Sequence, residues 1–171
     1  FSSANGLVST YLDILAGERS IANISMFFTV YSIALIISKP LTGKLLDVKG
    51  VYFVLIPAVI FAAAGMFFIG IATSLGVMLV AAVCKALGQG AGTPTIQAHA
   101  VKQLDKSKSG VAVSTVQIGQ SLGNSIAPVL GSFFVEPFGY KIMFCGVSGI
   151  VVFAGTILLL LRYGKEKRIR V

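Results

Sequence analysis

Long apolar runs dominate this sequence and constrain its fold more than any other feature. A helix that crosses a bilayer needs about 20 mostly apolar residues, because the hydrocarbon core is about 30 Å thick. Five runs have this length: 21–39, 51–72, 76–97, 111–135 and 140–161. A sixth run, 1–16, is apolar but short, and we interpret it as a truncated span. The sequence therefore predicts an all-α membrane protein with six transmembrane helices.

The composition argues against the common soluble classes. Apolar residues make up 56% of the chain and charged residues only 12%, whereas soluble domains carry about 25% charged residues. A water-soluble enzyme or a disordered chain is therefore disfavoured. The net charge of +8 could suggest nucleic acid, but the charges are confined to segments between the apolar runs. We expect membrane lipid as a partner and no nucleic acid.

Lysine and arginine are distributed unevenly between the two sets of connections. Only Arg19 and Lys141 lie in one set, and Lys85 lies within a run. The other set holds the remaining eleven: Lys39, Lys44, Lys49, Lys102, Lys106, Lys108, Arg162, Lys165, Lys167, Arg168 and Arg170. Cytoplasmic connections are enriched in basic residues. The tail 162–171 is therefore predicted to be cytoplasmic.

Polar residues follow a repeating order along the six runs. The first two runs are polar and the third is apolar, and the next three repeat this order. Polar groups facing lipid are costly, so the pattern predicts a 3+3 inverted repeat with the third and sixth helices on the lipid side. Gly70, in the third run, would then face lipid. The alternative is a bundle without repeats whose third and sixth helices are peripheral.

Lys85 is the most informative single residue. It lies nine residues after Gly76, which is about 13 Å along a helix and close to the bilayer centre. A charge at this depth indicates a functional site, unless the span boundary shifts and Lys85 is shallower. The candidates for lining a substrate cavity are Asn5, Lys85, Gln89, Gln117, Gln120 and Asn124.

Small residues recur every four positions in the fifth run. The predicted helix-packing positions are Gly119, Gly123, Ala127 and Gly131, together with Pro128. Small residues at this spacing let another helix backbone approach closely. The fourth run is similarly rich in glycine, at Gly88, Gly90 and Gly92. These glycines indicate either tight packing alone or a moving gate.

The segment 39–50, KPLTGKLLDVKG, is predicted to be a cytoplasmic loop. Gly43, Asp47 and Gly50 have the spacing of the loop signature of the major facilitator superfamily, which this segment resembles. Lys49 stands one place later than the usual basic residue, as in the weaker, second copy of that motif. The segments 119–131, GQSLGNSIAPVLG, and 87–94, LGQGAGTP, are similar to helix motifs of the superfamily's proton-linked drug exporters.

This resemblance implies the C-terminal half of a twelve-helix transporter, with an N-terminal six-helix half as its partner. It implies an ion-coupled exporter or antiporter in a bacterial plasma membrane, moving a small organic solute by alternating access, without cofactor or metal. Gly43, Asp47, Lys49 and Gly50 would form a conformational latch between the halves. Asp47 could instead only cap a helix start. The alternative function is a six-helix scaffold or a nonfunctional transporter fragment.

One tetrapeptide raises the possibility of an enzyme. Residues 146–149 read GVSG, the GxSG form of the intramembrane serine proteases. Such a serine needs a histidine in a later helix to activate it, whereas His99 precedes Ser148. We therefore predict no enzymatic activity, and a hydrogen bond between Ser148 and His99 would reverse that prediction.

Overall fold

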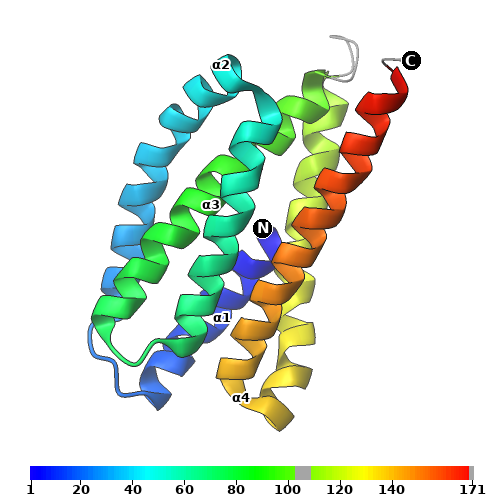
Figure 1. The fold of residues 1–171 in the computed structure, drawn as a ribbon. Coiled ribbons are helices and arrows are strands. Elements are labelled where there is room, and N and C mark those ends of the chain that lie inside the picture. Colours follow the sequence, from blue (N-terminus) through cyan, green and yellow to red (C-terminus); the bar gives the residue numbers. More distant parts are fainter. Residues whose placement is uncertain (103–108, 170–171) are drawn as a thin grey trace.

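Helices are the only regular secondary structure in the part of the chain that the structure describes. The computed structural model describes the backbone of residues 1–102 and 109–169, and the side chains of 1–102, 109–137 and 139–157. Its four helices are α1 (Ser2–Glu18), α2 (Ser25–Ile71), α3 (Leu75–Lys102) and α4 (Ser109–Ile169). They pack as one bundle with their axes roughly aligned (Figure 1).

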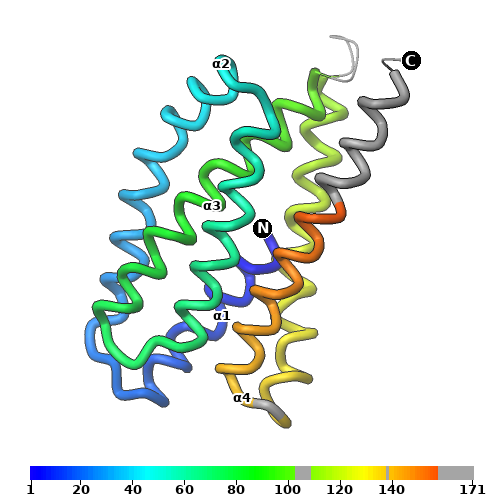
Figure 2. Tube along the Cα trace, in the orientation of Figure 1, coloured from blue at the N-terminus to red at the C-terminus, as the bar shows by residue number. Residues whose placement is uncertain are grey.

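Two of these helices fold back on themselves at a glycine. Gly50 in α2 has φ 81° and ψ 175°, and Gly139 in α4 has φ 73° and ψ 167°. Glycine adopts positive φ readily because it has no Cβ. Each long helix therefore forms a hairpin (Figure 2). The two arms of α2 are residues 25–49 and 51–71, and those of α4 are 109–138 and 140–169.

The positions of the chain reversals correct one expectation. The segment 39–50 is not a loop, because α2 continues through Pro40 as far as Lys49. The second reversal is at Gly139, between the predicted runs 111–135 and 140–161, and Glu136 and Pro137 before it are helical. The physical reason is that these reversals require positive φ, which glycine supplies and which the proline ring forbids.

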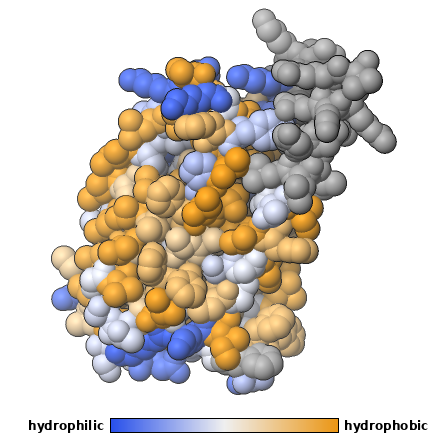
Figure 3. Space-filling view, viewed as in Figure 1, coloured by the Kyte–Doolittle hydropathy of each residue, from blue (hydrophilic) through white to orange (hydrophobic). Residues whose placement is uncertain are grey.

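The surface has the distribution of polarity that a bilayer requires. Among the described residues, three helical segments are long and apolar enough to cross a membrane: α2, α3 and residues 139–157. Hydrophilic residues gather at the two ends of the visible face, with an apolar band between them (Figure 3). The turn at Gly50 and the end of α3 lie at one end, and the turn at Gly139 lies at the other (Figure 1).

The second arm of α2 has both a packed face and an exposed apolar face. Ile60 and Phe67 are exposed, whereas Met66, Ile69 and Gly70 are buried. A Cβ on Gly70 would lie 2.9 Å from the Sγ of Cys145. The expectation that Gly70 faces lipid is therefore wrong, because an apolar sequence does not distinguish lipid from an apolar neighbouring helix.

Arg19 joins the connection after α1 to the end of α2. Its guanidinium donates hydrogen bonds to the carbonyl oxygens of Gly70 at 2.8 Å, Ile69 at 3.5 Å and Ala72. The last carbonyls of a helix have no partner within the helix, and a basic side chain satisfies them. This contact fixes the end of α1 beside the end of α2, where Leu12 and Leu15 of α1 and Ile69 of α2 belong to the same buried core.

Candidate functional site

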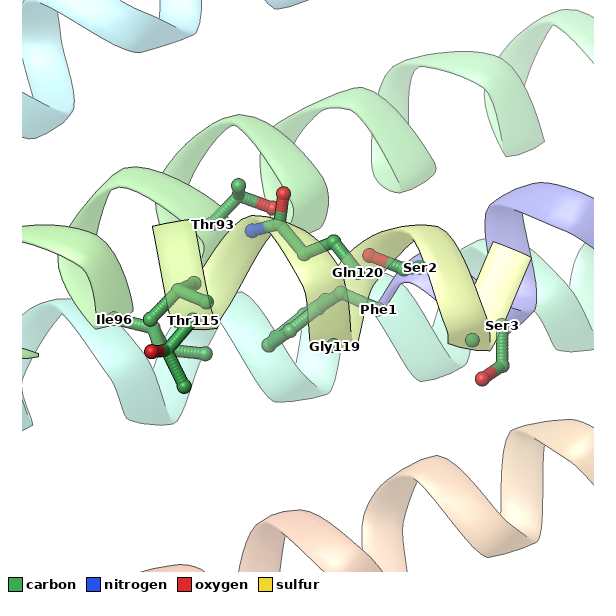
Figure 4. Close-up of a pocket in the computed structure, with 10 residues that line it drawn as sticks. Phe1, Ser2, Ser3, Thr93, Ile96, Thr115, Gly119 and Gln120 are labelled. Carbon is green, nitrogen blue, oxygen red and sulfur yellow. The ribbon is translucent and has the colours of Figure 1, made fainter. Parts of the chain in front are cut away.

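A cavity of about 460 Å³ lies between α1, α3 and the first arm of α4. Its volume is within the range of about 300–1,000 Å³ that is typical of small-molecule sites. Figure 4 shows Thr93 of α3 and Gln120 of α4 pointing toward one another across it. We call it the polar pocket, and its lining residues are Phe1, Ser2, Ser3, Thr93, Ile96, Thr115, Val116, Gly119, Gln120 and Gly123.

The lining of the polar pocket combines hydrogen-bonding groups with apolar surface. Ser, Thr and Gln side chains supply donors and acceptors, while Phe1, Ile96 and Val116 supply apolar contacts. Among the described residues, its lining includes no charged side chain. This chemistry suits a small organic molecule that has polar groups but no net charge.

A second cavity, of about 450 Å³, is more apolar. It lies between α1, both second arms and α3, and Phe1 and Ser3 line it as they line the polar pocket. Leu55, Val59 and Ile150 contribute to its apolar wall.

Lys85 is buried within the bundle, and only 3% of its surface is exposed. Its Nζ donates hydrogen bonds to Asn5 Oδ1 at 2.8 Å and to Gln89 Oε1 at 3.3 Å. The same Nζ lies 4.3 Å from the centre of the Tyr31 ring, in a cation–π geometry. The Tyr31 hydroxyl in turn donates to Gln89 Oε1 at 2.8 Å. Lys85 therefore links α1, the first arm of α2 and α3.

The lysine network and the polar pocket both include residues of α3. Lys85, Gln89 and Thr93 are spaced four residues apart, so they lie above one another on one face of the helix. Thr93 lines the polar pocket, whereas Lys85 and Gln89 do not. Three predicted cavity residues, Asn5, Lys85 and Gln89, therefore form one cluster beside the pocket.

The other predicted cavity residues all lie on the first arm of α4. Gln120 lines the polar pocket. Gln117 and Asn124 are exposed and are outside its lining. The six candidates therefore lie in three places. Three belong to the cluster around Lys85, Gln120 lines the polar pocket, and Gln117 and Asn124 are on the outer surface of α4.

The small residues of α4 differ in what they contact. A Cβ on Gly123 would lie 3.0 Å from Ser3 Oγ, and one on Gly131 would lie 2.5 Å from Leu7 Cδ2. Ala127 is buried, and the carbonyl of Pro128 accepts a 2.7 Å hydrogen bond from the Tyr11 hydroxyl. These positions pack α4 against α1.

Gly119 is the exception among these small residues, because a Cβ there would meet nothing within 4 Å. The glycines of α3 are packed more tightly. A Cβ on Gly88 would collide with the backbone nitrogen of Ala62, one on Gly90 with Ser38 Oγ, and one on Gly92 with the Phe1 ring.

The four latch candidates lie around the reversal of α2. Asp47 is exposed and lies in the last turn of the first arm. Gly43 has open space around its Cα. Lys49 Nζ lies 4.3 Å over the Phe53 ring, across the turn at Gly50.

Ser148 has a structural partner. Its hydroxyl donates a 2.8 Å hydrogen bond to the carbonyl of Ala63, which joins the second arms of α4 and α2. His99 lies in the wall of the apolar cavity. The described residues contain no cluster of three or more metal-binding side chains.

Several residues of the site were not among the sequence candidates. Tyr31 is an aromatic residue in an apolar run, and nothing in its surroundings signals a contact with Lys85. Thr93 could have been found, because it lies two turns from Lys85 on the same helical face. Ser2, Ser3 and Thr115 become site residues only through the crossing of α1, α3 and α4.

Comparison with known proteins identifies the family. The chain is 31% identical over 152 residues to the multidrug resistance protein MdtG of Citrobacter koseri, covering 86% of the chain and 37% of MdtG. It is 28% identical over 144 residues to the uncharacterized MFS-type transporter YuxJ of Bacillus subtilis, covering 84% of the chain and 36% of YuxJ.

The multidrug efflux pump SdrM of Staphylococcus aureus is 29% identical over 87 residues, covering 50% of the chain and 20% of SdrM. The chain thus spans little more than a third of the length of MdtG and YuxJ. The family model of the Major Facilitator Superfamily matches residues 1–170 of the chain. Because this match extends over nearly the whole chain, the chain belongs to the Major Facilitator Superfamily.

Proposed function

We propose that this chain is the C-terminal six-helix half of a secondary transporter that exports a small organic solute, driven by an ion gradient. Its arrangement would be a 3+3 inverted repeat, and its partner would be the N-terminal half of the same transporter. Alternating access would come from the two halves rocking around a central site. The names of MdtG and SdrM, a multidrug resistance protein and a multidrug efflux pump, favour export.

The polar pocket is the observation that carries this proposal. Polar side chains in a membrane protein normally face a cavity or another helix. Here hydroxyl and amide groups from three helices converge on a cavity of about 460 Å³, while Gln117 and Asn124 extend the polar surface of α4 beyond it. A partner half that covers this surface would complete a solute site shared between the halves.

The orientation follows from the basic residues. Lys44 and Lys49 precede the turn at Gly50, and we place this end in the cytoplasm together with the C-terminus. Lys106, another of the eleven basic residues on which this orientation rests, lies outside the described residues. Gly43, Asp47, Lys49 and Gly50 would contact the partner half at this end and stabilise one of the two conformations.

The test is transport by the full-length protein in lipid vesicles, with radiolabelled chloramphenicol as the probe. Chloramphenicol has hydroxyl and amide groups, an aromatic ring and no net charge, which matches the lining of the polar pocket. We expect the wild type to transport it and Gln120→Leu to reduce the rate by about tenfold, because a pocket hydrogen bond to the solute is lost.

Ser132→Ala is the matched control on the same helix. The Ser132 hydroxyl is exposed and donates to Val129 of its own helix, so its loss should leave transport unchanged. Failure of the wild type to transport chloramphenicol would contradict the proposed function. A Gln120→Leu variant that matches the wild type would contradict the assignment of the pocket.

A further inference from the structure

Lys85 carries a buried charge that the described chain does not neutralise. Its side-chain contacts are two amide oxygens and one aromatic ring. The acidic residues with described side chains, Asp13, Glu18, Asp47 and Glu136, are all exposed. A buried lysine is normally paired with an acid, because an isolated charge is costly away from water.

The groups around Lys85 stabilise a cation and not an anion. Asn5 and Gln89 direct oxygens at the ammonium, and the face of the Tyr31 ring is also electronegative. An anionic solute would meet these acceptors with the wrong polarity. The site therefore fits a positive charge. That charge is the Lys85 ammonium, which is positive because Nζ carries an additional proton.

From this geometry we infer that Lys85 is the group that binds and releases the coupling proton of the transporter. This inference rests on the proposed function and assigns its ion coupling to an amine in this half. Release breaks one N–H bond of the ammonium, leaves the electron pair on Nζ and transfers the proton to water that enters the polar pocket. Thr93, which lies two turns from Lys85 on the same helix, lines that pocket.

Proton release also changes the packing of three helices. The ammonium forms charge-assisted hydrogen bonds, which are roughly twice as strong as neutral ones, and a cation–π contact with Tyr31. A neutral amine loses both advantages, so the link between α1, α2 and α3 weakens. The protonation state of Lys85 therefore biases how α1 is held beside the polar pocket, as coupling between proton and solute requires.

The surroundings include few other titratable groups that could substitute for Lys85. On α2, the Tyr31 hydroxyl donates to Gln89, and the second arm of α2 presents Gly65 to the Lys85 backbone. On α1, Asn5 is the residue that contacts the Lys85 ammonium. Cys84 precedes Lys85 on α3, and the described side chains of α4 make none of the contacts above.

The test separates solute exchange from proton coupling in vesicles that contain the full-length transporter. Exchange of radiolabelled chloramphenicol at equal pH needs no net proton movement, whereas accumulation driven by a pH gradient does. We expect Lys85→Gln to keep exchange within about threefold of wild type and to lose accumulation by at least about tenfold. Lys85→Arg should behave likewise, because an arginine does not release its proton.

Lys44→Gln is the control for removal of a positive charge, because Lys44 is exposed near the end of the first arm. It should keep both activities. Retained accumulation in Lys85→Gln would overturn the inference, and so would a joint loss of exchange and accumulation. A wild type that shows neither activity would instead contradict the proposed function.

Discussion

The helix α3 and the first arm of α4 contain similar types of residue but have different surroundings. Both contain glycines, an internal proline and amide side chains. In α3, Gly88 is packed against the backbone of α2, and Gln89 is bonded to Lys85 and Tyr31. In α4, Gly119 has no close neighbour and Gln117 is exposed.

This difference shows that composition predicts which helices carry polar groups but not where those groups are used. Lys85 and Gln89 of α3 bond to other helices of this chain. The polar residues of the first arm of α4 remain available to a solute or to a partner half. Substitutions that add bulk or remove polarity should therefore lower stability more in α3 than in the first arm of α4.

The largest expected effect comes from adding bulk at the glycines. Gly88→Leu should prevent stable folding or lower the free energy of unfolding by about 3 kcal/mol or more, because the backbone of Ala62 has no room to move. Gly119→Leu should leave stability nearly unchanged, because its surroundings are open. The midpoint of thermal unfolding of the full-length protein in detergent measures both. Equal losses would remove the distinction between the two helices.

Removal of an amide should have a smaller effect. Gln89→Leu leaves the Tyr31 hydroxyl and one donor of Lys85 without an acceptor, so we expect a loss of about 1–3 kcal/mol in stability. Gln117→Leu should not change stability, because Gln117 is exposed. The same unfolding assay applies. A Gln117→Leu variant destabilised as much as Gln89→Leu would place both amides in the internal packing.

The smallest effect is expected where α4 contacts α1. Tyr11→Phe removes the hydrogen bond to the carbonyl of Pro128 and should lower the free energy of unfolding by about 0.5–1.5 kcal/mol. Ser132→Ala, which removes only a bond within α4, serves as the reference. A Tyr11→Phe variant as stable as the wild type would show that this contact contributes little to holding α4.

The sequence predicted the helical class and the family because both depend on features local to the chain. The apolar runs and the spacing of Gly43, Asp47 and Gly50 can be recognised without knowing what any helix touches. The chain reversals were less predictable, because proline and glycine both mark breaks in a sequence, whereas the turns at Gly50 and Gly139 require the positive φ that glycine supplies.

The site was only partly predictable because it depends on helix crossings. Lys85 was recognised from its depth alone, and Gln120 from its polarity within an apolar run. Tyr31 and Ser3 contact Lys85 and the polar pocket only because helices distant in sequence meet there. The error at Gly70 has the same origin, since its neighbour Cys145 lies on another helix.

Cysteine reactivity tests most directly whether α4 presents its polar face to water while α3 keeps its own inside. In full-length protein with Cys84→Ala and Cys145→Ala, Gln117→Cys and Thr95→Cys would be treated with a water-soluble maleimide. Thr95 is fully buried in α3. We predict that Gln117→Cys reacts at least about tenfold faster and is protected by chloramphenicol. Equal rates, or a Gln117→Cys variant that does not react, would contradict this account.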